Sequence, residues 1–353
     1  KEEIERALKT PSFDGFQLLQ LQDFPGQGTA LVGLLDAFWE SKGVISAEEF
    51  RQFNSELVPL LRFEKAVYES GDTFSAKLEV ANFYEELKGQ TLNWSITNEA
   101  GHELAKGSQG DLDLKLGNNN MLGEINYVFN TDQAEKLKVE LVLDGTVNKN
   151  NWPIWVYPST VRLNSDQIVI TESYEAAKLA LDEGKSVLLN PKYELLKGIE
   201  GRFVPVFWSP VHFPNQPSSM GLLMDNKHAA FNDFPTSHFT EWQWWDLCIQ
   251  SKSLIIDSLD VKPIVRVIDN FVTNHHLANV FEAKVGKGKL LFSSIDLIRK
   301  LEERPTARQL RSSLLQYMES PAFDPTGVVN MDDLDFLDEA SVKQFETTDI
   351  YND

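Results

Sequence analysis

The spacing of hydrophobic positions changes abruptly near the start of the chain. Residues 15–22 are mostly apolar and predict a β-strand, whereas residues 31–39 carry apolar side chains at helical spacing. The polar turn 23–28 between them contains one proline and two glycines. A strand, a glycine-rich turn and a helix form one βα unit. Because a parallel strand needs other parallel strands beside it, one such unit cannot complete a sheet alone.

A helix is also predicted on each side of this unit. Ile4 and Leu8 share one face of a short amphipathic helix. Ser46 and Glu49 have the spacing of a capping box, which predicts the start of a second helix. Residues 1–60 therefore have the pattern of an α/β segment that holds a single strand.

Residues 61–158 follow a period of two. Short alternating runs are separated by turns rich in Gly, Asn and Asp, and this spacing over about a hundred residues predicts a β-sandwich of immunoglobulin-like type. The region has no cysteine pair, so no disulfide can link the two sheets. A large apolar side chain must take that place in the core, and Trp94 is the candidate for this staple. Residues 151–158 contain two prolines and predict an edge strand that leaves the domain.

In residues 159–320, strands alternate with helices. A strand at 168–171 precedes a helix that ends at Gly184, and two later strands flank a glycine-rich turn at 286–288. This alternation predicts a doubly wound, flavodoxin-like α/β domain. Residues 321–353 are acidic with a weak apolar pattern, and we expect them to form a C-terminal extension.

Charge and cysteine content narrow the function classes. The formal net charge of −20 argues against nucleic acid and against anionic membranes as partners. No apolar run approaches the roughly 20 residues that cross a bilayer. The single cysteine, Cys248, excludes an internal disulfide and any multi-cysteine metal site. The first ten residues are charged and not a signal peptide, and without a starting Met we expect a cut or processing boundary there.

The stretch GFQLLQLQDFPGQGTALVGLLDAFWESKG, residues 15–43, resembles the end of the catalytic barrel in family-two glycoside hydrolases of Bacteroidetes-type bacteria, which include β-galactosidase-like enzymes. The resemblance covers residues 11–55 and continues through the predicted sandwich. Residues 281–297 are similar to the late strand pair of the class I glutamine-amidotransferase-like domains appended to many β-galactosidases. The order of the three segments matches such enzymes.

This resemblance implies that residues 1–60 are the last βα unit of a (β/α)8 TIM barrel. Retaining enzymes of this family use two carboxylates about 5 Å apart, from the fourth and seventh barrel strands. Neither strand is in this sequence, so we expect no catalytic residue here and no hydrolysis by this chain alone. The parent would act on carbohydrate without a cofactor or metal. We expect it in the bacterial periplasm or outside the cell, and a homo-oligomer is left open.

Asp23 and Gln27 are the candidate substrate-binding residues. Both follow the carboxyl end of a predicted parallel strand, where barrel enzymes build their active sites, so they are candidate ligands of sugar hydroxyls in the intact enzyme. The structural alternative is that Asp23 caps the following helix and Gln27 is an ordinary loop residue. Gly26 and Gly28 fit the backbone geometry of the turn better than phosphate binding.

Other chemically distinctive residues favour structural roles. An amidotransferase nucleophile belongs on a strand-to-helix elbow, but Cys248 lies in an apolar helical stretch and is predicted to be a buried thiol. The C-terminal α/β domain is therefore predicted to be non-catalytic. His275 and His276 are adjacent and cannot easily chelate one metal ion. The aromatic residues 239–245 form either a sugar-stacking platform or core.

Three functions remain open. The first is the C-terminal portion of a retaining glycoside hydrolase, with one active-site loop and two accessory domains. The alternative is a free-standing carbohydrate-binding or assembly module. The third is an active amidotransferase-like domain, which requires a reactive Cys248.

Overall fold

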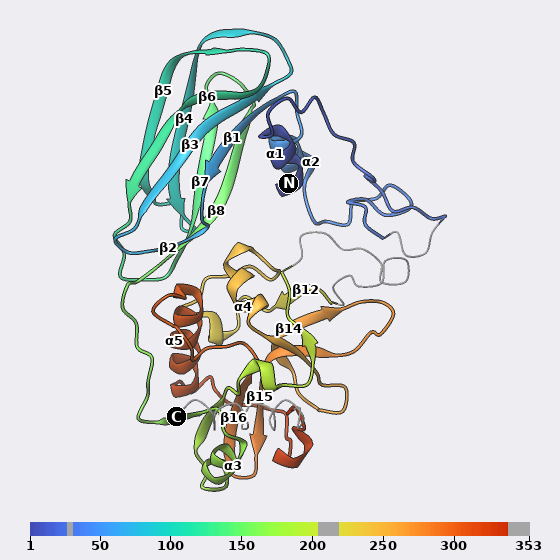
Figure 1. Ribbon diagram of the computed structural model, residues 1–353, viewed down its shortest axis with the longest axis vertical. Coiled ribbons are helices and arrows are strands. Elements are labelled where there is room, and N and C mark those ends of the chain that lie inside the picture. Colours follow the sequence, from blue (N-terminus) through green and yellow to red (C-terminus); the bar gives the residue numbers. More distant parts are fainter. Residues whose placement is uncertain (27–30, 204–218, 338–353) are drawn as a thin grey trace, which may run out of the picture. The chain divides into compact units, whose positions relative to one another are not determined.

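A computed structural model describes residues 1–26, 31–203 and 219–337 of the chain (Figure 1). The chain divides into two compact units, the first formed by residues 1–130 and 136–156 and the second by residues 131–135 and those after 156. β-strands dominate, with five α-helices among the described residues, so the protein is a β-rich multidomain chain. In the described ranges, no helix is long and apolar enough to span a membrane.

The first unit contains two sheets. One has the strand order β1–β3–β6 and the other β2–β8–β7–β4–β5. The bounds are β1 (Leu57–Phe63), β2 (Val67–Glu69), β3 (Thr73–Asn82), β4 (Leu87–Asn98), β5 (Glu103–Leu114), β6 (Gly117–Val128), β7 (Glu135–Leu143) and β8 (Lys149–Tyr157). Pairing is antiparallel in β1–β3, β3–β6, β4–β5 and β4–β7.

The core of this unit lies between the two sheets. Along β7 every second side chain from Leu137 to Leu143 is buried, while Lys138 points to solvent, as a half-buried strand requires. Side chains of β1, β3 and β6 join those of β4, β7 and β8 in one hydrophobic cluster. Trp94 packs at the edge of this cluster and is only half-buried, whereas Trp152 is 2% exposed. The predicted staple is therefore peripheral, and the core is filled mainly by aliphatic residues and phenylalanines.

Helices α1 (Glu2–Leu8) and α2 (Ala47–Phe53) pack beside β1 (Figure 1). Ile4, Leu8 and Phe53 form a second small core with residues of β1 and β3. The predicted capping box is present, because the Ser46 hydroxyl accepts from the Glu49 N–H and the Glu49 carboxylate accepts from the Ser46 N–H.

The predicted strand 15–22 and helix 31–39 do not form. Among the described residues of this segment, a single parallel bridge joins Gln22 to Leu35, and Leu35 also bridges to Ser41. Large apolar side chains stay in solvent, with Leu19 81% and Phe38 85% exposed. The physical reason is that a parallel strand has nothing to pair with when no neighbouring strand lies beside it.

The second unit is built on one eight-stranded sheet. Its main path is β11–β13–β15–β16–β10–β9, and β14 joins β15 to β12. The bounds are β9 (Ile168–Thr171), β10 (Ser186–Leu189), β11 (Ile199–Glu200), β12 (Ser219–Met224), β13 (Lys252–Ile255), β14 (Pro263–Asp269), β15 (Leu277–Val285) and β16 (Gly288–Ser293).

This sheet is mixed and differs from the predicted doubly wound parallel sheet. Among the described strands, the parallel pairs are β9–β10 and β10–β16. β13, β14 and β16 each pair antiparallel with β15. β11 pairs antiparallel with β13, and β12 with β14. The tight turn at Gly286 reverses the chain between β15 and β16, which fixes this half of the sheet as antiparallel. The predicted strands at 168–171 and 277–285 are confirmed.

Helices of this unit follow the sequence signals. α3 (Tyr174–Asp182) is capped by Ser173 and is followed by Gly184 at φ 83°, and it packs on β9, β10 and β16. α5 (Pro305–Glu319) begins with proline in its first turn and is buried along most of its length. α4 (Trp245–Ile249) is preceded by the short 3-10 helix η3 (Trp242–Trp244).

The side chain of Glu5 holds α1 against the sandwich. Glu5 is 1% exposed, and its carboxylate accepts from the Asn150 amide at 2.9 Å and the Trp152 indole N–H at 2.8 Å. Lys9 lies 3.3 Å from the same carboxylate. A buried carboxylate persists only where donors and positive charge surround it, as they do here.

We expect Glu5→Ala to destabilise the first unit by about 2 to 4 kcal/mol, because it leaves two buried donors without an acceptor. The control is Glu3→Ala, because Glu3 is exposed and lies 3.8 Å from Arg6. An ion pair on the surface contributes at most about 1 kcal/mol to stability. Urea unfolding of the two variants measures the difference. Equal stabilities would show that Glu5 does not anchor α1.

Candidate functional site

Asp23 lies in a small closed loop and not at the end of a strand. Its side chain is 6% exposed, and its Oδ1 accepts from the Lys42 ammonium at 2.7 Å and the Gly33 N–H at 2.9 Å. The backbone N–H of Asp23 donates to the Leu35 carbonyl at 3.0 Å. A Cβ on Gly33 would lie 2.2 Å from the backbone of Gln22, so glycine allows this close approach.

The two sequence-predicted site residues have different outcomes. The hydrogen bond from Lys42, assisted by the Gly33 N–H, lowers the pKa of the Asp23 carboxyl below its ordinary value. Asp23 is therefore an anion that joins residues 22–23 to 31–42, and among the described residues after it no helix begins before Ala47. Gln27 lies outside the described residues. Lys42, the partner of Asp23, gave no sequence signal because it is 19 positions away.

The thiol of Cys248 is unsuited to nucleophilic chemistry. It lies on α4, it is 5% exposed, and burial raises its pKa to about 12. A thiolate is the reactive form of cysteine, so such a thiol is inert near neutral pH. This agrees with a buried structural role and argues against the amidotransferase hypothesis.

The aromatic stretch 239–245 divides between core and surface. Trp244 is fully buried and donates from its indole N–H to Thr236 at 2.9 Å. Trp242 packs on the Phe203 ring at 4.9 Å, while Trp245 is 50% exposed. These side chains therefore do not form a single platform for sugar stacking.

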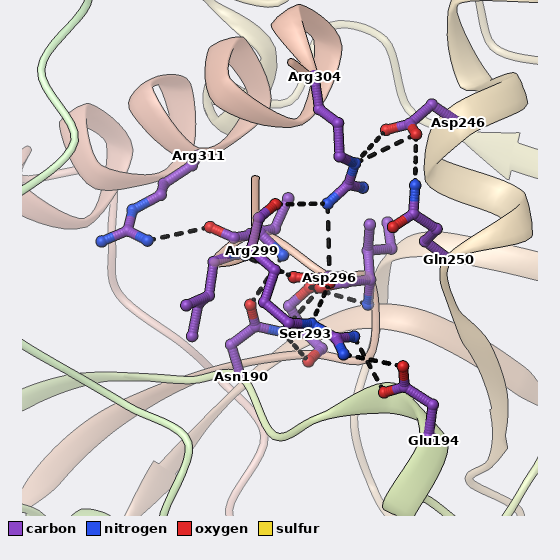
Figure 2. Close-up of polar contacts among 12 residues, drawn as sticks. Asn190, Glu194, Asp246, Gln250, Ser293, Asp296, Arg299, Arg304 and Arg311 are labelled. Carbon is purple, nitrogen blue, oxygen red and sulfur yellow. Dashed lines mark hydrogen bonds and ion pairs between the residues drawn. The ribbon is translucent and has the colours of Figure 1, made fainter. Parts of the chain in front are cut away.

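A polar network that the sequence did not predict lies past the carboxyl ends of β10 and β16 (Figure 2). Asn190 follows β10, donates to the carbonyls of Ser293 and Ile295, and accepts from the Leu297 N–H. All three of these side-chain hydrogen bonds go to the end of β16 or to the residues just after it, so Asn190 ties the ends of two parallel strands together. In α/β sheets this edge is where ligands bind.

Arg304 is the centre of the charged part of this network. It is 7% exposed and lies between Asp246 on α4, at 2.8 Å, and Asp296 after β16, at 3.7 Å (Figure 2). Asp296 also accepts from Arg299 at 2.6 Å, and Arg299 forms a second pair with Glu194 at 2.8 Å. The Nη2 atom of Arg304 has no hydrogen-bond partner in the part of the chain that the structure describes.

The charged groups of this network hold neighbouring elements in place and are not arranged for acid–base catalysis. Both oxygens of Asp296 already accept hydrogen bonds, two from the backbone N–H groups of Ile298 and Arg299 and one from the Arg299 side chain. Guanidinium groups stay protonated at all ordinary pH values and cannot act as bases. The sequence signal that could have identified Asn190 and Asp296 is that each lies within three residues of the end of an apolar strand.

The described ranges contain no candidate metal site. No group of three or more His, Cys, Asp or Glu side chains there has a geometry that could hold an ion. His275 contacts Asp257 at 2.6 Å through Nδ1, and this hydrogen bond raises the pKa of the imidazole.

Two sequence families match parts of the chain. Residues 168–338 match a domain of unknown function, DUF8487, and residues 72–158 match another, DUF8488. No curated protein matches significantly.

Solved structures show only weak similarity. A cycloisomaltooligosaccharide glucanotransferase from Paenibacillus sp. is 11% identical with a TM-score of 0.24, over 42% of this chain and 22% of that one. A β-glucuronidase from Parabacteroides merdae is 8% identical with a TM-score of 0.22, over 38% and 21%. A conjugative transposon lipoprotein from Bacteroides eggerthii is 10% identical with a TM-score of 0.20, over 29% and 98%. The chain spans about a fifth of the length of the first two proteins, and overlaps of this size carry no argument about activity.

The contacts of Asp23 predict that the stability of the folded chain depends on pH. Because the folded-state pKa of Asp23 is lowered, its stabilising contribution is complete above the unfolded-state pKa and is lost as the pH falls through the folded-state value. NMR titration of the carboxyl carbon should show this low pKa, and Lys42→Met should raise it. Lys88→Met, on an exposed lysine in β4, should not change it. An ordinary Asp23 pKa in the unmodified chain would contradict the ion pair.

Proposed function

We propose that this chain is the C-terminal part of a retaining glycoside hydrolase that acts on carbohydrate in the bacterial periplasm or outside the cell. In this proposal residues 1–60 complete a (β/α)8 barrel, the sandwich is immunoglobulin-like, and the second unit is a non-catalytic, amidotransferase-like domain. The two catalytic carboxylates belong to barrel strands outside this sequence, so the chain alone is inactive.

The observation that carries the proposal is the exposed apolar surface of residues 13–44. Eleven of the 27 exposed large apolar side chains among the described residues lie in this segment, which is less than a tenth of the chain. They are Phe13, Phe16, Leu18, Leu19, Leu21, Phe24, Leu31, Val32, Phe38, Trp39 and Val44. Apolar surface of this density marks a region that packs against another protein surface.

The pattern of these side chains supports a missing sheet as the partner. Four of the six residues 16–21 are apolar, and mostly apolar strands occur in parallel sheets covered by helices. The helices on either side of the segment, α1 and α2, are formed and are packed on the sandwich. Among the described residues, the segment between these helices has neither neighbouring strands nor the helix expected at 31–39.

The arrangement around Asp23 supports a role for this loop in binding. Asp23 follows the apolar run directly, at the position where barrel strands present ligands to substrate. In the absence of neighbouring strands its carboxylate pairs with Lys42. We infer that in a complete barrel Asp23 accepts hydrogen bonds from sugar hydroxyls, with Gln27 in the same loop.

The test begins with the coding sequence upstream of Lys1. A polypeptide that includes it should hydrolyse aryl glycosides with retention of configuration, whereas residues 1–353 alone should not. In the longer protein, Asp23→Asn should lower kcat/KM at least tenfold. Asp14→Asn is the matched control, because Asp14 lies at the other end of the same apolar run and should leave kcat/KM unchanged.

Two results would contradict the proposal. Hydrolysis by residues 1–353 alone would place the catalytic groups within this chain. An upstream sequence without a barrel pattern would instead favour a free-standing carbohydrate-binding or assembly module.

A further inference from the structure

The second unit contains a groove made of two adjoining hollows. They share the lining residues Lys262, Pro263, Thr326 and Gly327. The larger hollow has a volume of about 510 Å³ and the smaller one about 90 Å³. Small-molecule sites in proteins typically measure about 300 to 1,000 Å³, so the groove is large enough for a compact ligand.

The floor of the groove is fixed by backbone contacts. Lys284 on β15 donates to the Gly327 carbonyl at 2.8 Å and accepts from the Val329 N–H at 3.0 Å, which adds this segment to the edge of the sheet. A Cβ on Gly327 would lie 2.4 Å from the Asp260 carbonyl. Glycine therefore allows residues 326–328 to approach the start of β14 closely, and the two segments form one continuous surface.

Three basic side chains line the larger hollow. Lys262, Arg266 and His276 are exposed, and their side chains form no ion pair or hydrogen bond with any part of the chain that the structure describes. The larger hollow has one carboxylate, Asp260, and it pairs with none of the three. The full chain carries 53 acidic residues against 33 lysines and arginines, so two unpaired cations, Lys262 and Arg266, in one groove run against the average charge. Lysine and arginine side chains that have no carboxylate partner can attract and bind an anionic group.

Hydrogen-bond acceptors line the smaller hollow. Asp225, His228 and Glu282 face it. The Glu282 carboxylate accepts from the Tyr317 hydroxyl at 2.6 Å, and the His228 ring packs on Tyr317 at 5.1 Å, so α5 holds both side chains in place. Carboxylates accept hydrogen bonds only, and sugar hydroxyls can donate to them.

We propose that this groove binds a hexose that carries an anionic group. Lys262, Arg266 and His276 contact the anion, and Asp225 and Glu282 accept from the hydroxyls. The apolar side chains of the larger hollow offer a surface for the sugar ring, and they are Ile256, Val261, Pro263 and Leu277. The groove lies wholly in the second unit, so this proposal does not depend on the proposed function of residues 1–60.

The test is isothermal titration of the full chain with four probes: glucuronic acid, glucose 6-phosphate, glucose and inorganic phosphate. At least one of the two anionic sugars should bind, and at least tenfold more tightly than glucose or inorganic phosphate. Arg266→Met and Lys262→Met should each weaken that binding at least fivefold. Lys287→Met is the control, because Lys287 lies in the β15–β16 turn at the far end of β15 from Leu277 and should leave the affinity unchanged.

The four probes separate the outcomes. Preference for glucuronic acid identifies a sugar carboxylate as the ligand group, and preference for glucose 6-phosphate identifies a sugar phosphate. Binding of inorganic phosphate as tightly as the sugars would overturn the proposal, as would equal binding of glucose. It would also fail if neither anionic sugar binds, or if the Arg266 and Lys262 variants, shown by circular dichroism to be folded, keep full affinity.

Discussion

A β-strand needs hydrogen-bond partners for its backbone and apolar neighbours for its side chains, and this requirement governs both units of the protein. In the first unit, β3 is paired on both edges, by β1 and β6, and its side chains fill a shared core. In the second unit, β15 is paired by three other strands. Residues 15–22 have a strand-like sequence but only a single bridge, from Gln22 to Leu35, and their large apolar side chains are exposed.

Charged groups are buried only where the fold supplies compensating partners. Glu5 is surrounded by an amide, an indole and a lysine, and Asp296 by two backbone N–H groups and two arginines. Both networks fasten elements that are distant in sequence, α1 to β8 in the first case and α4 to the segment between β16 and α5 in the second. Removing a partner from such a network costs more than the pair contributes, because a buried charge is left alone.

Local signals predicted much of the fold, and long-range pairing explains what they missed. The Ser46 capping box, the Gly184 helix end and the turn at 286–288 depend on neighbouring residues and are confirmed. The direction of β13 and β14 depends on which strand they meet, and the apolar runs do not encode it. For the candidate site, Asp23 was identified but its contact with Lys42 was not. The groove around Arg266 gave no sequence signal because its lining comes from three separated segments.

The central claim is that residues 15–22 form a strand only beside partner strands that this chain lacks. Hydrogen–deuterium exchange measures this directly, by comparing residues 15–22 in the 353-residue chain with the same residues in a polypeptide that includes the upstream sequence. The account predicts rapid exchange in the shorter chain and strong protection in the longer one, with β3 equally protected in both. Equal exchange of residues 15–22 in the two proteins would contradict it.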